Sequence, residues 1–98
     1  MYMVKTEYGD HMVSIEKKRY VSNNRLAIQL NEEYEPFAML TTNIDDGRDL
    51  PDGYSYVDTN NCPWAEDFIR ENHLGEPTGD YESSGFCTYP LYRFEIGD

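Results

Sequence analysis

The residues with side chains capable of covalent chemistry are two cysteines, Cys62 and Cys87, and two histidines, His11 and His73. Cys62 precedes Pro63 at the start of the clearest helix pattern, where a helix dipole lowers the pKa of a thiol. His73 falls in the last turn of that helix, roughly 15 Å away at about 1.5 Å per residue. Because no third group is placed to orient these side chains, we expect no catalytic residue and interpret both cysteines as packed core residues.

A calcium site could be imagined in the segment that holds Asp45, Asp46, Asp49 and Asp52. The spacing lacks the alternating ligands and the final bidentate glutamate of an EF-hand loop. The cysteines and histidines do not follow a zinc-binding spacing, and the glycines are too irregular for a phosphate-binding loop. The sequence therefore predicts no metal and no cofactor.

The charge is strongly negative and unevenly distributed. The 98 residues carry a net charge of −11. Residues 1–25 hold five cations and three anions, whereas residues 26–98 hold three cations and sixteen anions. Such a surface repels nucleic-acid backbones and membrane headgroups and attracts basic protein grooves. We expect a protein partner, with no direct binding of nucleic acid or membrane, although acidity can also serve only to keep a small domain soluble.

Acidic residues alternate with tyrosines, of which the chain has nine. Tyrosine supplies rigid, amphipathic contact area at protein-binding surfaces, although Tyr54, Tyr56 and Tyr92 also fit a sheet or core. We expect the partner-binding carboxylates, acting as substitutes for nucleic-acid phosphates, to be Glu32, Glu33, Glu35, Asp45, Asp46, Asp49 and Asp52. The basic stretch Lys17–Arg19 is the alternative interface.

One helix, from about Pro63 to Leu74, is predicted to cover one face of a sheet. A residue among 60–62 can cap its start, Pro63 suits the first turn, and Gly75 suits its end. The apolar spacing gives the helix one buried face: Ala65, Phe68, Ile69 and Asn72. We expect Cys62 and Cys87 to lie near each other beneath Trp64, and the sequence leaves open whether they ever pair.

The remaining pattern is of short strands. Alternating or continuous apolar residues predict strands at 2–6, 11–20, 25–30, 36–44, 54–58 and 86–96. In the third, Leu26, Ile28 and Leu30 should face inward and Arg25 and Ala27 outward. The strand at 36–44 should be central, the one containing Pro90 should lie at an edge or carry a bulge, and 76–85 should be a connector.

These elements predict an α+β fold in a single domain, residues 1–98. We expect an antiparallel sheet of about five to six strands with one α-helix packed on one face. No apolar run approaches the roughly 18 residues that a membrane span needs. The N-terminal residues also lack the pattern of a signal peptide, so we expect a cytoplasmic protein.

Four segments resemble a family of small, acidic, uncharacterised proteins carried by bacterial plasmids, conjugative elements and phages. They are residues 25–31, 35–41, 57–68 and 85–92, and the most specific pieces are Asn-Asn-Cys-Pro-Trp and Gly-Phe-Cys-Thr-Tyr-Pro. The resemblance brings no catalytic residues with it. It implies a stoichiometric inhibitor of a host defence nuclease, of anti-CRISPR or antirestriction type; the alternative is an accessory or regulatory module of the mobile element.

Overall fold

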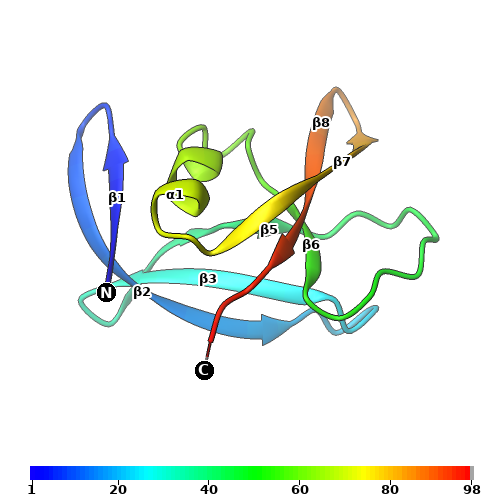
Figure 1. Ribbon diagram of the computed structural model, residues 1–98, viewed down its shortest axis with the longest axis horizontal. Helices are drawn as coiled ribbons and strands as arrows, with labels where there is room; N and C mark the ends of the chain where they lie inside the picture. The colour runs from blue at the N-terminus through cyan, green and yellow to red at the C-terminus, as the bar shows by residue number, and fades with distance from the viewer. Residues whose placement is uncertain (98) are drawn as a thin grey trace.

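The computed structural model describes residues 1–97, and antiparallel strands make up most of it (Figure 1). The elements are β1 (Tyr2–Thr6), β2 (Gly9–Arg19), β3 (Leu26–Glu32), β4 (Glu35–Met39), β5 (Thr41–Thr42), β6 (Tyr54–Val57), α1 (Ala65–Glu71), β7 (Gly75–Ser84) and β8 (Cys87–Phe94). Two four-stranded sheets result, with the orders β1-β2-β3-β4 and β5-β6-β8-β7. The α+β class is confirmed, whereas the prediction of one sheet with five to six strands is corrected to two sheets.

The chain passes from the first sheet to the second at Leu40. The N–H of Leu40 donates to the carbonyl of Ile28, and the N–H of Asp58 donates to the carbonyl of Leu40, each at 2.9 Å. The single central strand predicted at 36–44 is therefore wrong, because β4 and β5 are edge strands of different sheets. The segment is apolar because the crossing point itself lies in the core, where Leu40 is fully buried.

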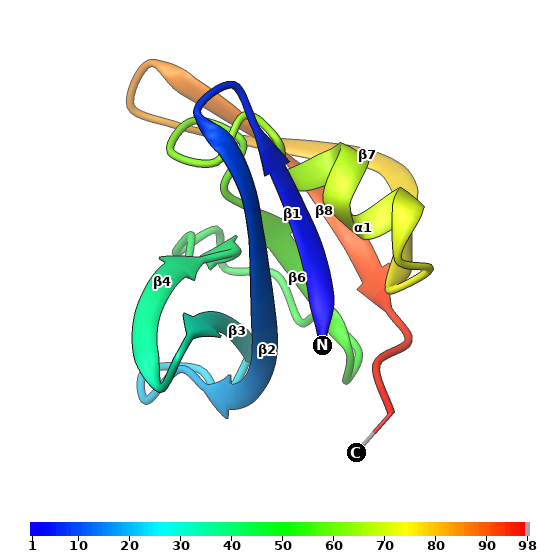
Figure 2. The same ribbon diagram turned by 90° about the vertical axis from the view of Figure 1, so that its left-hand side faces the viewer.

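The main core lies between the two sheets and α1. It combines residues of β2, β3 and β8 with the buried face of the helix, Ala65, Phe68 and Ile69. In both views α1 lies between β1 and β7 (Figures 1 and 2). The inward positions predicted for Leu26, Ile28 and Leu30 are confirmed, but Arg25 and Ala27, predicted to face outward, are also buried.

A second, smaller core covers the other face of the second sheet. Ile44, Tyr56 and Leu91 form it, with Leu50 packed against them. Ile44 and Leu50 of the long connection between β5 and β6 therefore pack over the sheet, while most of the residues between them remain exposed. As a result β8 contacts apolar residues on both of its faces, which strict alternation along the strand does not predict.

Helix α1 is shorter than predicted, and both of its ends differ from the expectation. Trp64 occupies the N-cap position without a side-chain hydrogen bond. The carboxylate of Asp58 instead accepts hydrogen bonds from the N–H and side-chain amide of Asn61 at 3.1 and 2.9 Å, which stabilises the preceding turn. Among residues 1–97, no helix is long and apolar enough to cross a membrane.

The C-terminal end of α1 is closed by His73 and not by Gly75. The N–H of Leu74 donates to the carbonyl of Ile69 at 3.0 Å, and that of His73 to the carbonyl of Arg70 at 3.2 Å. These are the two bonds of a Schellman motif, which requires a left-handed residue after the cap. His73 fills that position with a φ of 54°.

Replacing His73 with glycine is expected to raise the free energy of unfolding by about 1 kcal/mol, because the left-handed conformation costs a residue with a Cβ roughly 1–2 kcal/mol. Urea denaturation of the two proteins measures the difference. A His73→Ala control keeps the Cβ, so it should not show this gain. A glycine variant no more stable than the alanine variant would contradict the assignment.

The segment predicted to be a connector, residues 76–85, is mostly strand β7. It pairs with β8 from Gly75 opposite Phe94 to Ser84 opposite Cys87, with a register shift between Pro77 and Tyr81. Both faces of β7 are largely exposed, so its side chains are as polar as those of a loop. Pro90 lies in β8, an interior strand, and not at a sheet edge. It is next to this register shift, and β6 pairs only with the residues of β8 that follow Pro90.

Candidate protein interface

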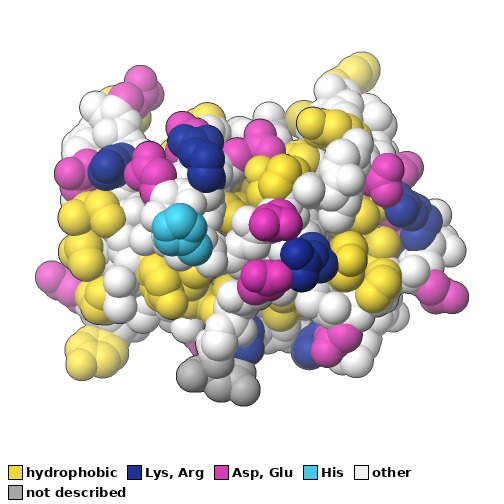
Figure 3. All heavy atoms as spheres, in the orientation of Figure 1, with side chains coloured by type: hydrophobic (Ala, Val, Ile, Leu, Met, Phe, Trp, Pro, Cys, Tyr) yellow, Lys and Arg dark blue, Asp and Glu magenta, His cyan; other side chains and the backbone are white. Residues whose placement is uncertain are grey.

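The seven carboxylates predicted to bind a partner do not form one surface. Glu32 lies at the far end of β3 from Arg25, which contacts Asp46. At about 3.3 Å per residue, the two ends of this segment are roughly 20 Å apart. Figure 1 shows the β3–β4 turn and the β5–β6 connection at opposite ends of the molecule. The space-filling view shows acidic side chains spread over the whole face (Figure 3).

At one end, the β3–β4 hairpin displays three of the predicted glutamates around a tyrosine. Its two-residue turn consists of Glu33 and Tyr34, with φ values of 51° and 70°. The Tyr34 side chain is fully exposed at 104%. Within residues 1–97, Glu33 and Glu35 are exposed and form no ion pair, whereas Glu32 lies 2.8 Å from Nδ1 of His11. We call residues 32–35 the acidic hairpin.

At the other end, Asp46 is a structural residue and not a partner-binding one. Its side chain is only 2% exposed and lies 2.6 Å from Nη2 of Arg25. It also accepts hydrogen bonds from the hydroxyl of Tyr56 at 2.6 Å and from the N–H of Arg48 at 3.0 Å. Arg25 in turn donates to the carbonyls of Ile44 and Arg48. This network fixes the β5–β6 connection onto the second sheet, so the prediction for Asp46 is corrected.

The network shifts the acid–base equilibria of its members. Burial alone raises the pKa of Asp46, but hydrogen bonds from Tyr56, Arg25 and Arg48 outweigh it and lower that pKa to about 2. Burial, followed by the hydrogen bond to Asp46, raises the pKa of Tyr56 to about 12. Asp46 is therefore ionised and Tyr56 neutral at pH 7.

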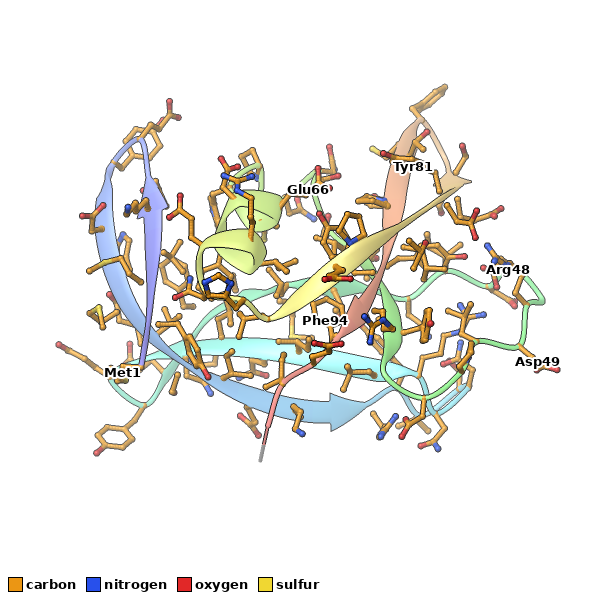
Figure 4. All side chains as sticks on the ribbon, in the orientation of Figure 1. Met1, Arg48, Asp49, Glu66, Tyr81 and Phe94 are labelled. Carbon is orange, nitrogen blue, oxygen red and sulfur yellow. The ribbon has the colours of Figure 1, made fainter. Side chains whose placement is uncertain are left out.

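The other three aspartates of the β5–β6 connection are exposed. Asp52 pairs with Arg19, which lowers its pKa. Asp45 and Asp49 form no ion pair with the described residues, and Asp49 points away from the molecule at the end of the connection (Figure 4). This end thus offers two unpaired carboxylates.

The alternative interface, Lys17–Arg19, is largely engaged by the chain itself. Lys17 donates to the carbonyl of Ile96 at 3.1 Å, and Lys18 donates to the side-chain amide of Gln29 at 2.8 Å. Arg19 is paired with Asp52. The positive charge of this stretch is therefore partly neutralised by its own surroundings.

Cys62 does not have the lowered pKa that its place before a helix suggested. Burial, assisted by the nearby charge of Asp58, raises the pKa of its thiol to about 11. The thiol donates to the carbonyl of Met39 at 3.5 Å within the main core. Cys87 is only partly buried, near the β7–β8 turn, and is not a member of that core, so the prediction that both cysteines are core residues holds for Cys62 alone.

An aromatic groove lies on the surface between the β1–β2 hairpin and the turn before α1. Its volume is about 600 Å³. Its lining comes from residues 5–8 and His11, from Phe37 on β4, and from Asn61, Pro63 and Trp64. The rings of His11 and Phe37 lie 4.8 Å apart, and those of Phe37 and Trp64 lie 6.0 Å apart. No single stretch of the sequence predicts this groove, because its residues come from three separate segments.

A family model described as a domain of unknown function, DUF4313, matches residues 14–97. The chain belongs to the DUF4313 family. The match covers α1 and strands β3 to β8, so it includes the acidic hairpin, Phe37 and Trp64. The tip of the β1–β2 hairpin precedes the matched DUF4313 region. No curated protein and no solved structure matches the chain.

Proposed function

We propose that this protein inhibits a host defence nuclease, of anti-CRISPR or antirestriction type, by stoichiometric binding to a basic nucleic-acid groove. The observation that carries the proposal is the acidic hairpin. A fully exposed tyrosine, Tyr34, stands there between Glu33 and Glu35, two carboxylates without a cationic partner in residues 1–97. Interface hot spots are enriched in tyrosine, and unpaired carboxylates steer a protein toward basic surfaces.

The backbone of the acidic hairpin is strained in a way that favours a functional role. A two-residue hairpin turn with both φ values positive normally uses Asn-Gly or another glycine-containing pair. Here Glu33 and Tyr34 occupy it. In addition, Glu32 and Glu35 pair directly across the ladder, where like charges destabilise a sheet. Such local costs cluster at binding sites, where the side chains are needed for another purpose.

Replacing this turn with asparagine and glycine, Glu33→Asn with Tyr34→Gly, is expected to raise the free energy of unfolding by about 1 to 2 kcal/mol by removing left-handed strain. The same variant should bind the partner more weakly, because it loses the tyrosine and one carboxylate. Urea denaturation and a binding titration measure the two effects. A variant that gains stability and keeps full affinity would show that the turn is not part of the interface.

Charge reversal provides the direct test of the interface. The variant Glu33→Lys/Glu35→Lys should inhibit nuclease cleavage at least roughly tenfold less well, since like charges at a basic groove repel. The matched control is Asp45→Lys/Asp49→Lys, which changes the net charge equally at two exposed, unpaired carboxylates of the opposite end. Loss of inhibition only in the control would move the interface to the β5–β6 connection. Full inhibition by both variants would exclude phosphate mimicry.

The alternative function is that of an accessory or regulatory module of a mobile element. Its sequence support is the basic stretch Lys17–Arg19, which a phosphate mimic does not need. Because the chain's own acceptors engage these cations, they support the alternative less than the unpaired glutamates support inhibition. Binding to proteins of the element, together with no effect on any nuclease, would favour the module.

A further inference from the structure

We infer that the aromatic groove receives an arginine-bearing segment of the partner, with the guanidinium stacked on Trp64 and Tyr8. The inference rests on the proposed function, because it assumes a basic partner. It gives that partner a second contact site besides the acidic hairpin. The groove, of about 600 Å³, is large enough for one such side chain and its neighbours.

The aromatic wall of the groove is held in place by packing. Trp64 lies between Phe37, with ring centroids 6.0 Å apart, and Phe68, at 5.9 Å and edge to face. Phe68 belongs to the main core, so its contact with the indole holds Trp64 against that core. Tyr8, in contrast, is 90% exposed at the β1–β2 turn. The packed indole and the exposed phenol provide two π faces for a ligand.

The charges around the groove favour a cationic ligand. The two groups of the lining that can carry positive charge are engaged: Nζ of Lys5 lies 3.5 Å from Glu71, and Nδ1 of His11 lies 2.8 Å from Glu32. Glu7, which also lines the groove, is exposed and forms no ion pair with the described residues. The groove therefore combines aromatic faces with an available carboxylate.

Arginine suits this combination better than lysine does. A guanidinium stacks on an aromatic face and can donate two parallel hydrogen bonds to one carboxylate, whereas an ammonium is a compact and strongly hydrated charge. An uncharged proline-rich segment could use the aromatic faces but would leave Glu7 without a partner. The negative charge of the chain, −11, also draws basic segments toward it.

The test uses the chain's only tryptophan as its probe. The whole protein is titrated with three peptides of equal length, acetyl-(Gly-Arg)₃-amide, acetyl-(Gly-Lys)₃-amide and acetyl-(Gly-Pro)₃-amide, while the emission of Trp64 is recorded. We expect a saturable change with the arginine peptide at the lowest concentration. No saturable change, or an equal response to the proline peptide, would overturn the inference.

A pair of matched variants separates the groove from general charge attraction. Glu7→Gln/Tyr8→Ala removes a Glu-Tyr pair at the groove, and Tyr81→Ala/Glu82→Gln removes a Tyr-Glu pair on strand β7, outside both the groove and the acidic hairpin. The first variant should lower the affinity for the arginine peptide roughly three- to thirtyfold, because it removes one cation–π contact and one exposed ion pair. The second should change its affinity by less than about twofold. Equal losses in both variants would overturn the inference.

The peptide titration also distinguishes the inference from the proposed function. It requires no nuclease, so binding by the arginine peptide tests the groove alone. A protein that inhibits a nuclease but ignores the peptides would retain the proposed function and lose the groove. A protein that binds the arginine peptide through the groove but inhibits no nuclease would retain the groove and lose the function.

Discussion

Replacing Asp46 with alanine is expected to lower the free energy of unfolding by about 3 to 5 kcal/mol, because it leaves a buried guanidinium without its carboxylate. Both side chains of the Arg25–Asp46 pair are at least nine-tenths buried, and Tyr56 loses its acceptor at the same time. The β5–β6 connection should then detach from the second sheet. Urea denaturation measures the loss.

The control for this prediction is Asp45→Ala, one residue earlier in the same connection. Asp45 is exposed and without an ion pair among residues 1–97, so its loss should change stability by less than about 0.5 kcal/mol. Equal effects of the two substitutions would contradict the assignment of Asp46 as the structural residue of the connection.

The same network predicts how stability depends on pH. The folded-state pKa of Asp46 is depressed from 3.8 to about 2. Its contribution, about 2 to 3 kcal/mol, is therefore fully present above pH 4 and is lost as the pH falls through 2. In the Asp46→Ala protein this part of the acid destabilisation should be missing. Parallel stability curves for both proteins between pH 5 and 2 would contradict the lowered pKa.

Replacing Gly75 with alanine is expected to lower the free energy of unfolding by about 3 kcal/mol, at the upper end of the range for overpacking. A Cβ at this position would lie 2.5 Å from the carbonyl oxygen of Arg93 and 3.0 Å from the Cα of Phe94. Both are backbone atoms of β8, so neither can move without disturbing the pairing of β7 with β8. Gly75 is thus required for close approach of two strands and not for ending the helix.

Thermal unfolding of the Gly75→Ala protein measures this cost, and Gly97→Ala is its control. A Cβ on Gly97 would meet no atom within 4 Å, so that variant should unfold like the parent protein. If Gly75→Ala unfolded like the parent as well, the close approach of β7 to β8 would be wrong.

The sequence predicts most of the strands because their side chains alternate. Leu26, Ile28 and Leu30 show the pattern of a half-buried strand, and they are indeed buried in the main core. The alternation pattern fails to predict β7, because this strand pairs through its backbone while both of its faces remain polar and exposed. Backbone pairing does not require apolar side chains, so the polar composition of this segment predicted a connector and not a strand.

The candidate interface is predictable only in part, for a related reason. An aspartate in an acidic loop has the same sequence signature whether it faces solvent or a buried arginine. Asp46 is bound by Arg25, more than twenty positions earlier, and by Tyr56, ten positions later, whereas Asp49 is exposed. The aromatic groove is also hidden in the sequence, because His11, Phe37 and Trp64 meet only in the folded chain.

The most direct test of the proposed inhibitor is a titration of DNA cleavage by purified CRISPR and restriction nucleases with this protein. We predict that cleavage by a susceptible nuclease stops at a fixed molar ratio of protein to enzyme, that the inhibition weakens as salt increases, and that Glu33→Lys/Glu35→Lys weakens it at least roughly tenfold. Inactivation by far less than one equivalent, or uninhibited cleavage by every nuclease at excess protein, would contradict the account.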